Sequence, residues 1–240
     1  MTQLVFIHGP GAGGCAEGFR YQLEHFPGSL APTLPGHLSG VSCASVERYT
    51  DWLRGWLWAQ GQQRDLVLVG FTLGASIALQ YGLDYPDEVK GLVCMTVAMR
   101  PKRRAPGTYA LRQQAAEDPT VYARWLDAMR TVMQHIDPAF REELIACHEK
   151  VGPRSQYHDL MVIDHFDVRD RISTLQPPLL LIRGLDDPSA PEEYEQEIHQ
   201  AVPGSQYITL RAAGHFPMAE QPVVVNQAIQ AFLDTLQGGR

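Results

Sequence analysis

The chain has 240 residues, 45% of them hydrophobic and 20% charged, and its 20 basic and 27 acidic residues give a formal net charge of −7. This composition excludes a disordered protein, and the net acidity argues against nucleic acid as the main partner because phosphate binding needs a basic surface. The sequence has no apolar run of about 18 residues and no signal-peptide pattern at its start, so we expect no membrane partner and a cytoplasmic protein.

Short apolar runs alternate with helical patterns along most of the chain. The runs predict strands at residues 4–7, 30–34, 66–69, 89–97, 178–182 and 206–210. Helical spacing of apolar residues predicts helices at residues 46–57, 75–85, 191–201 and 222–236. Strands separated by helices in this order predict an α/β protein, with a mostly parallel sheet covered by helices on both faces.

Residues 100–166 interrupt this alternation. They carry 10 basic and 9 acidic residues, show no strand pattern and predict helices at 109–116, 120–134, 138–149 and 156–164. We therefore expect one core domain, formed by residues 1–99 and 167–240, with residues 100–166 inserted as a helical segment. Four cations at the start of the insertion would lie near the mouth of a pocket and could attract an anionic substrate: Arg100, Lys102, Arg103 and Arg104.

The first turn that carries chemistry is Gly70-Phe71-Thr72-Leu73-Gly74, between a predicted strand and a predicted helix. A residue at the centre of such a sharp turn is pushed out above the sheet, next to backbone N–H groups at the helix start. Thr72 therefore presents a hydroxyl as a candidate nucleophile, although its extra methyl group restricts χ1. A glycine turn that only joins strand to helix remains the alternative.

Two further turns supply a candidate acid and a candidate base. Residues 184–191 follow a predicted strand and contain Asp186 and Asp187, which could also serve only to shape the turn. His215 follows the last predicted strand. The chain order Thr72, Asp187, His215 is that of nucleophile, acid and base in one large group of enzymes.

These three turns, together with residues 8–14 and 34–37, resemble the motifs of the α/β-hydrolase fold superfamily over nearly the whole chain. The resemblance implies that Thr72 is the nucleophile, Asp187 the catalytic acid and His215 the base. It also makes the insertion a helical cap over the site. The chain departs from the superfamily pattern in several ways: among them, it starts at what would be the third strand, it has Thr72 where serine is usual, and Phe71 stands where histidine is often found.

The resemblance implies an oxyanion hole made by residues 8–14 and the N–H group of Leu73. Pro10 stands where the family often supplies a second N–H group, and proline has none, so we expect Gly11 to replace it. Phe71 and Phe216, beside the predicted nucleophile and base, are expected to line an apolar substrate pocket.

The function implied is hydrolysis of a small ester, lactone or thioester through an acyl-enzyme, on a largely apolar substrate that could carry an anionic group. Alternatives are a lyase or cofactor-free oxygenase that uses the His215–Asp187 pair as a general base, a hydrolase of carbon–carbon bonds, and a non-catalytic binding module. The four cysteines and the histidines of the insertion lack metal-ligand spacing, so we predict no metal and no cofactor. We expect a monomer or homodimer.

Overall fold

The computed structural model describes residues 2–11 and 16–238. Within this part of the chain, five strands form one fully parallel sheet and lie side by side in chain order. Every residue of the second and fourth strands is buried, as expected for strands covered on both faces. The strands are β1 (Gln3–Ile7), β2 (Leu66–Phe71), β3 (Val89–Met95), β4 (Leu179–Gly184) and β5 (Gln206–Leu210).

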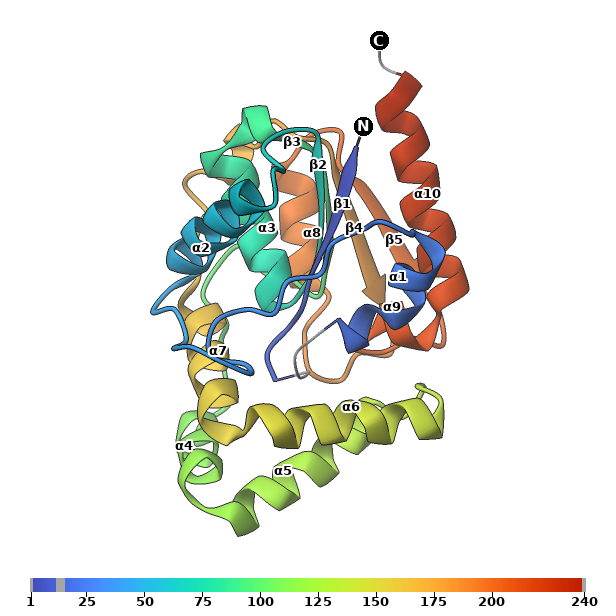
Figure 1. Ribbon diagram of the computed structural model, residues 1–240. Coiled ribbons are helices and arrows are strands. Elements are labelled where there is room, and N and C mark those ends of the chain that lie inside the picture. Colours follow the sequence, from blue (N-terminus) through green and yellow to red (C-terminus); the bar gives the residue numbers. More distant parts are fainter. Residues whose placement is uncertain (1, 12–15, 239–240) are drawn as a thin grey trace.

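Helices cover both faces of the sheet, as predicted (Figure 1). Side chains alternate along each strand, so Val5 and Ile7 pack into the core on one face and Phe6 packs into the core on the other. The first face carries α2 (Val46–Ala59), α3 (Leu73–Asp84) and α8 (Glu193–Ala201); the second carries α1 (Arg20–His25), α9 (Pro217–Glu220) and α10 (Pro222–Gly238). Short 3₁₀ helices lie at Glu17–Phe19, Pro86–Glu88 and Ile172–Thr174.

The predicted insertion is helical and lies between β3 and β4 along the chain. It contains α4 (Thr108–Glu117), α5 (Pro119–Val132), α6 (Pro138–Val151) and α7 (Pro153–His165). The last three begin with proline, whose fixed φ suits the first helical turn and whose missing N–H has no partner to lose there. The four helices lie across the end of the sheet where the strands terminate (Figure 1). We keep residues 100–166 as the proposed limits of this insertion.

One predicted strand is wrong. Residues 30–34 do not form a strand, and only Leu30 bridges β1, by donating to Leu4 O and accepting from Phe6 N. Pro32 and Pro35 have no N–H group to donate, which ends the ladder after a single bridge. The other predicted strands and helices are present, with bounds shifted by a few residues.

Buried carboxylates of α7 hold the insertion together and attach it to the core. Asp164 accepts hydrogen bonds from Arg104 and Arg112, which precede it in the insertion. Asp159 accepts from Tyr49 of α2 at 2.7 Å and lies 3.0 Å from the Nε2 atom of His37. Neither carboxylate side chain is exposed, so loss of these partners would leave an uncompensated buried charge. None of the described helices is long and apolar enough to cross a membrane.

Candidate active site

Thr72 occupies a sharp turn between β2 and α3, at φ 48° and ψ −104°. Positive φ is rare for a β-branched residue and costs about 1–3 kcal/mol, which the surrounding structure must supply. The turn also requires Gly70 and Gly74: a Cβ atom at Gly70 would lie 2.3 Å from Gly74 O, and one at Gly74 would lie 1.9 Å from Ile7 O. The chain thus accepts strain to project Thr72 from the end of the sheet.

The hydroxyl of Thr72 is buried and faces the backbone of Gly9. A Cβ atom at Gly9 would lie 2.4 Å from Thr72 Oγ1, and this oxygen has no hydrogen-bond partner among the described residues. The structure therefore does not join the predicted nucleophile to His215 by a hydrogen bond. Because χ1 of threonine has few favourable values, the directions open to this hydroxyl are limited.

His215 and Asp187 are in direct contact. His215 Nδ1 lies 2.8 Å from Asp187 Oδ2, and the carboxylate is 1% exposed. Burial alone would raise the pKa of Asp187, but the attraction of His215 and hydrogen bonds from His215 and Ser189 lower it overall. An ionised Asp187 keeps the imidazole proton on Nδ1, which leaves Nε2 as the basic atom. Asp186 is exposed and makes no such contact.

Ser189 is a site residue that the sequence prediction missed. Its hydroxyl lies 2.7 Å from both His215 Nδ1 and Asp187 Oδ1, and its backbone N–H donates to Asp187 Oδ1 at 2.8 Å. The O–H donates to the carboxylate, so its oxygen is free to accept from the imidazole. The serine therefore orients both members of the pair. The sequence signal was its position two residues after the predicted acid, where an Asx turn is common.

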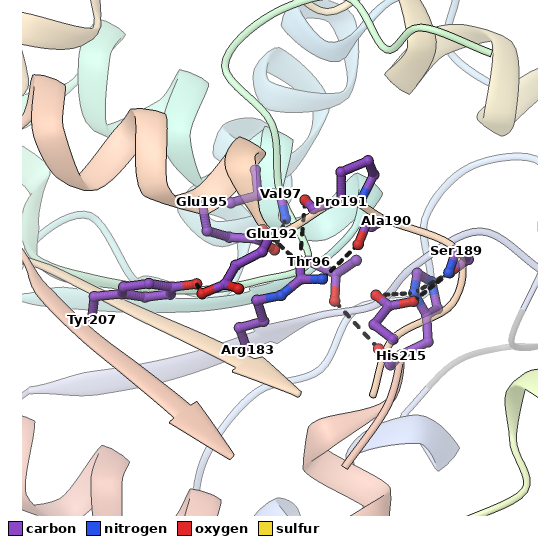
Figure 2. Close-up of polar contacts among 11 residues, drawn as sticks. Thr96, Val97, Arg183, Ser189, Ala190, Pro191, Glu192, Glu195, Tyr207 and His215 are labelled. Carbon is purple, nitrogen blue, oxygen red and sulfur yellow. Dashed lines mark hydrogen bonds and ion pairs between the residues drawn. The ribbon is translucent and has the colours of Figure 1, made fainter. Parts of the chain in front are cut away.

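Arg183 of β4 and Glu195 of α8 form a buried ion pair beside this loop (Figure 2). The guanidinium also donates to Ala190 O at 2.5 Å and Pro191 O at 3.4 Å. Burial raises the pKa of Glu195 to about 7, although Arg183 opposes the shift. The pair thus fastens the segment that follows Ser189. The sequence signal for this pair is an arginine near the end of an otherwise apolar strand.

A cavity of about 190 Å³ lies between these turns and the insertion. Thr72 and His215 both line it, so the predicted nucleophile and base share one space. The predicted pocket residues Phe71 and Phe216 also line it, with ring centroids 5.0 Å apart. The insertion adds apolar walls that the sequence placed only in general terms: Trp125, Met129, Val132, Leu160 and Ile163. The cavity can therefore hold a small, partly apolar molecule against Thr72.

The loop that is predicted to bind an oxyanion contacts the cavity at one end and the helical insertion at the other. Gly9 abuts the Thr72 hydroxyl, and Pro10 lines the cavity. Gly11 has a φ of +70° and abuts the insertion: a Cβ atom there would lie 2.6 Å from the Nδ1 atom of His148. The predicted donor role of Gly11 and Leu73 stays a prediction. Residues 12–14 lie outside the described part of the chain.

His8 anchors this loop in its neutral form. Its Nδ1 atom donates to Gly9 O at 2.7 Å, and its Nε2 atom accepts from the N–H of Leu34 at 3.0 Å. Together, the two bonds require a neutral imidazole that is protonated on Nδ1 and unprotonated on Nε2. Burial, aided by the nearby His37, lowers the pKa of His8 to about 3.

Acidification from pH 8 to pH 5 should therefore lower the free energy of unfolding. The unfolded state takes up a proton near pKa 6.5 while the folded His8 stays neutral, so this contribution is full above pH 6.5 and is lost as pH falls. At pH 5 the loss is about 2 kcal/mol for one such histidine. Urea unfolding at both pH values measures it. Between pH 8 and pH 5, the His8→Gln variant should lose less stability than the wild type. Equal losses in both proteins would contradict the neutral state of His8.

A model of the alpha/beta hydrolase family matches residues 4–228, which is nearly the whole chain. The chain belongs to this family. The alpha/beta hydrolase fold predicted from its motifs is confirmed, including the helical insertion α4–α7. In the described residues, no group of three or more His, Cys, Asp or Glu side chains could hold a metal ion.

Several proteins to which the chain is similar are named as esterases or hydrolases. The chain is 25% identical to the pimeloyl-(acyl-carrier protein) methyl ester esterase of Vibrio vulnificus, with 91% of this chain and 89% of the relative covered. It is also 25% identical to the pyrethroid hydrolase of Sphingobium wenxiniae, with 98% and 88% covered. A malate-bound thermophilic esterase from Thermogutta terrifontis shares the fold, with a TM-score of 0.84, 23% identity and 98% and 90% coverage.

These relatives confirm, at the level of the family, the prediction of an enzyme of the ester-hydrolase type. This alpha/beta hydrolase differs from the expected pattern at the nucleophile position, where it carries Thr72. The roles of Thr72, Asp187 and His215 remain predictions.

Proposed function

We propose that the protein hydrolyses small carboxylic esters, lactones or thioesters through an acyl-enzyme formed on Thr72. The observation that carries the proposal is the pair His215–Asp187, assembled with a 2.8 Å contact at the wall of the cavity that Thr72 also lines. The esterase relatives support the same reaction class.

In the proposed reaction, Thr72 first rotates about χ1 from Gly9 toward His215. His215 Nε2 then removes the hydroxyl proton as the oxygen attacks the ester carbonyl, and Asp187 stabilises the imidazolium that forms. The imidazolium passes its proton to the leaving alcohol, and water, activated by the same nitrogen, releases the acid. The N–H groups of Leu73 and Gly11 are proposed to hold the oxyanion; one such donor is typically worth about 3 kcal/mol.

One observation favours a second candidate function. Thr72 Oγ1 has no hydrogen-bond partner, whereas His215 and Asp187 are already in contact. The pair could act as a general base on a C–H or O–H acid without any covalent intermediate, as in a lyase or cofactor-free oxygenase. Thr72 would then only position the substrate.

Labelling with an alkyl fluorophosphonate separates the two functions, because only an activated hydroxyl displaces fluoride. We expect one adduct per chain by intact mass, located on Thr72 by peptide mapping and absent from the Thr72→Ala variant. Ser189 carries another hydroxyl in contact with the His215 ring, so the Ser189→Ala variant is the matched control and should still be labelled. Turnover that depends on His215 without any adduct on Thr72 would refute the acyl-enzyme and favour the general base.

A further inference from the structure

The lining of the cavity beside Thr72 is rich in cations. Lys102, Arg104 and Arg112 all line it, and none of its lining residues in the described chain is Asp or Glu. All three cations come from the insertion. Arg100 instead forms ion pairs with Glu193 and Glu197 of α8, so the sequence prediction of one basic cluster of four at the pocket mouth is only partly correct.

One carboxylate serves two of these cations. Asp164 lies 2.6 Å from Arg104 Nη2 and 2.6 Å from Arg112 Nη1. A single negative charge leaves this pair of arginines with a surplus of one positive charge. Arg112 Nε is buried and has no hydrogen-bond acceptor among the described residues. The arginines are therefore held in place yet keep unused capacity to bind an anion.

Lys102 has no carboxylate partner among the residues that the structure describes. Its backbone N–H donates to Asp164 O, but none of the ion pairs in the described chain includes its ammonium group. Burial, with the positive charge of Arg104, lowers the pKa of Lys102 to about 8, whereas Asp164, Glu195 and Asp187 act from a distance in the opposite direction. A half-buried cation without a counter-ion is costly, and an anionic ligand would remove that cost.

We propose that Lys102, supported by Arg104 and Arg112, binds a carboxylate group carried by the ester substrate. This inference rests on the proposed function and names its substrate class: monoesters of short dicarboxylic acids. The ester end would lie at Thr72, the methylene chain against the apolar wall at Trp125, and the free carboxylate at Lys102. A volume of about 190 Å³ suits an acyl chain of a few carbons.

The test compares monoethyl adipate with its terminal carboxamide, which has nearly the same shape but no charge. Wild-type kcat/KM should be at least 10-fold higher for the acid. Lys102→Met should remove this preference through KM and leave the carboxamide unchanged, while Lys102→Arg should retain part of it. The matched control is Arg103→Met, because Arg103 is exposed and does not line the cavity. An unchanged preference in Lys102→Met, or an equal loss for both esters, would overturn the proposal.

Binding of free adipate, measured by calorimetry, keeps this test independent of hydrolysis. We expect adipate to bind the wild type, and both adipamide with the wild type and adipate with Lys102→Met to bind at least 10-fold more weakly. If adipate binding depends on Lys102 but no ester is cleaved, the carboxylate subsite stands and the proposed hydrolysis fails. If esters are cleaved but adipate and adipamide bind equally, the hydrolysis stands and the subsite fails.

Discussion

Replacing Thr72 with serine should raise kcat/KM for small esters by up to about 10-fold. Thr72 Oγ1 lies beside Gly9 and has no hydrogen-bond partner among the described residues, so in the proposed reaction the side chain turns toward His215 before attack. Serine has no methyl group and turns toward His215 more easily. Each change of about 1.4 kcal/mol in the activation free energy changes a rate tenfold, so a small easing of this rotation gives an effect of this size. Initial rates with the wild type and Thr72→Ser measure the effect.

Removal of the hydroxyl gives the opposite result. Thr72→Ala and Thr72→Val should each lower ester kcat by at least about 10³-fold, because neither can form the acyl-enzyme. The valine variant keeps the branched shape and so controls for the loss of packing in the alanine variant, with thermal unfolding as the check on folding. Full activity in both variants would exclude Thr72 as the nucleophile.

Asp187→Asn and His215→Gln should each lower ester kcat by about 10³- to 10⁴-fold with little change in KM. An asparagine amide at position 187 would donate to His215 Nδ1 and move the ring proton to Nε2, the atom that must act as base. Steady-state kinetics of both variants measure the loss. The double variant should be no slower than the worse single variant, since the two residues act as one unit.

Asp186→Asn is the matched control for this loss. Asp186 is adjacent to Asp187 in the chain but exposed, and its backbone N–H donates to Ala213 O, a bond that the substitution keeps. Near wild-type activity is expected. A loss as large as that in Asp187→Asn would show that the charge of the loop, rather than the contact with His215, matters for activity.

The architecture was readable from local patterns because its causes are local. Buried parallel strands require apolar runs, and the turn at Thr72 requires Gly70 and Gly74, since any Cβ atom there would strike backbone oxygens. The prediction of a strand at 30–34 was wrong because it rested on apolar residues and gave too little weight to proline. In the structure, hydrogen bonding is decisive, and the missing N–H groups end the pairing at Leu30.

The sequence predicted part of the site, and the residues that it missed share one property. Thr72 and His215 were placed at strand ends, and both line the cavity. The family resemblance favoured Asp187 over Asp186, and the structure adds the 2.8 Å contact of Asp187 with His215, which lies 28 residues further along the chain. Ser189, Arg183 and Glu195 act through similar long-range contacts. No local pattern encodes such pairings.

The residues alone established the α/β architecture, the inserted helices, and the order of a candidate nucleophile, acid and base. These follow from periodicity and turn chemistry, which depend on near neighbours in the chain. The tertiary structure alone decided that the Thr72 hydroxyl lies beside Gly9 and makes no hydrogen bond to His215. It also decided that Lys102 lines the cavity while Arg100 pairs with α8. Side-chain direction at such positions depends on how the insertion packs over the sheet, and that packing joins segments far apart in sequence.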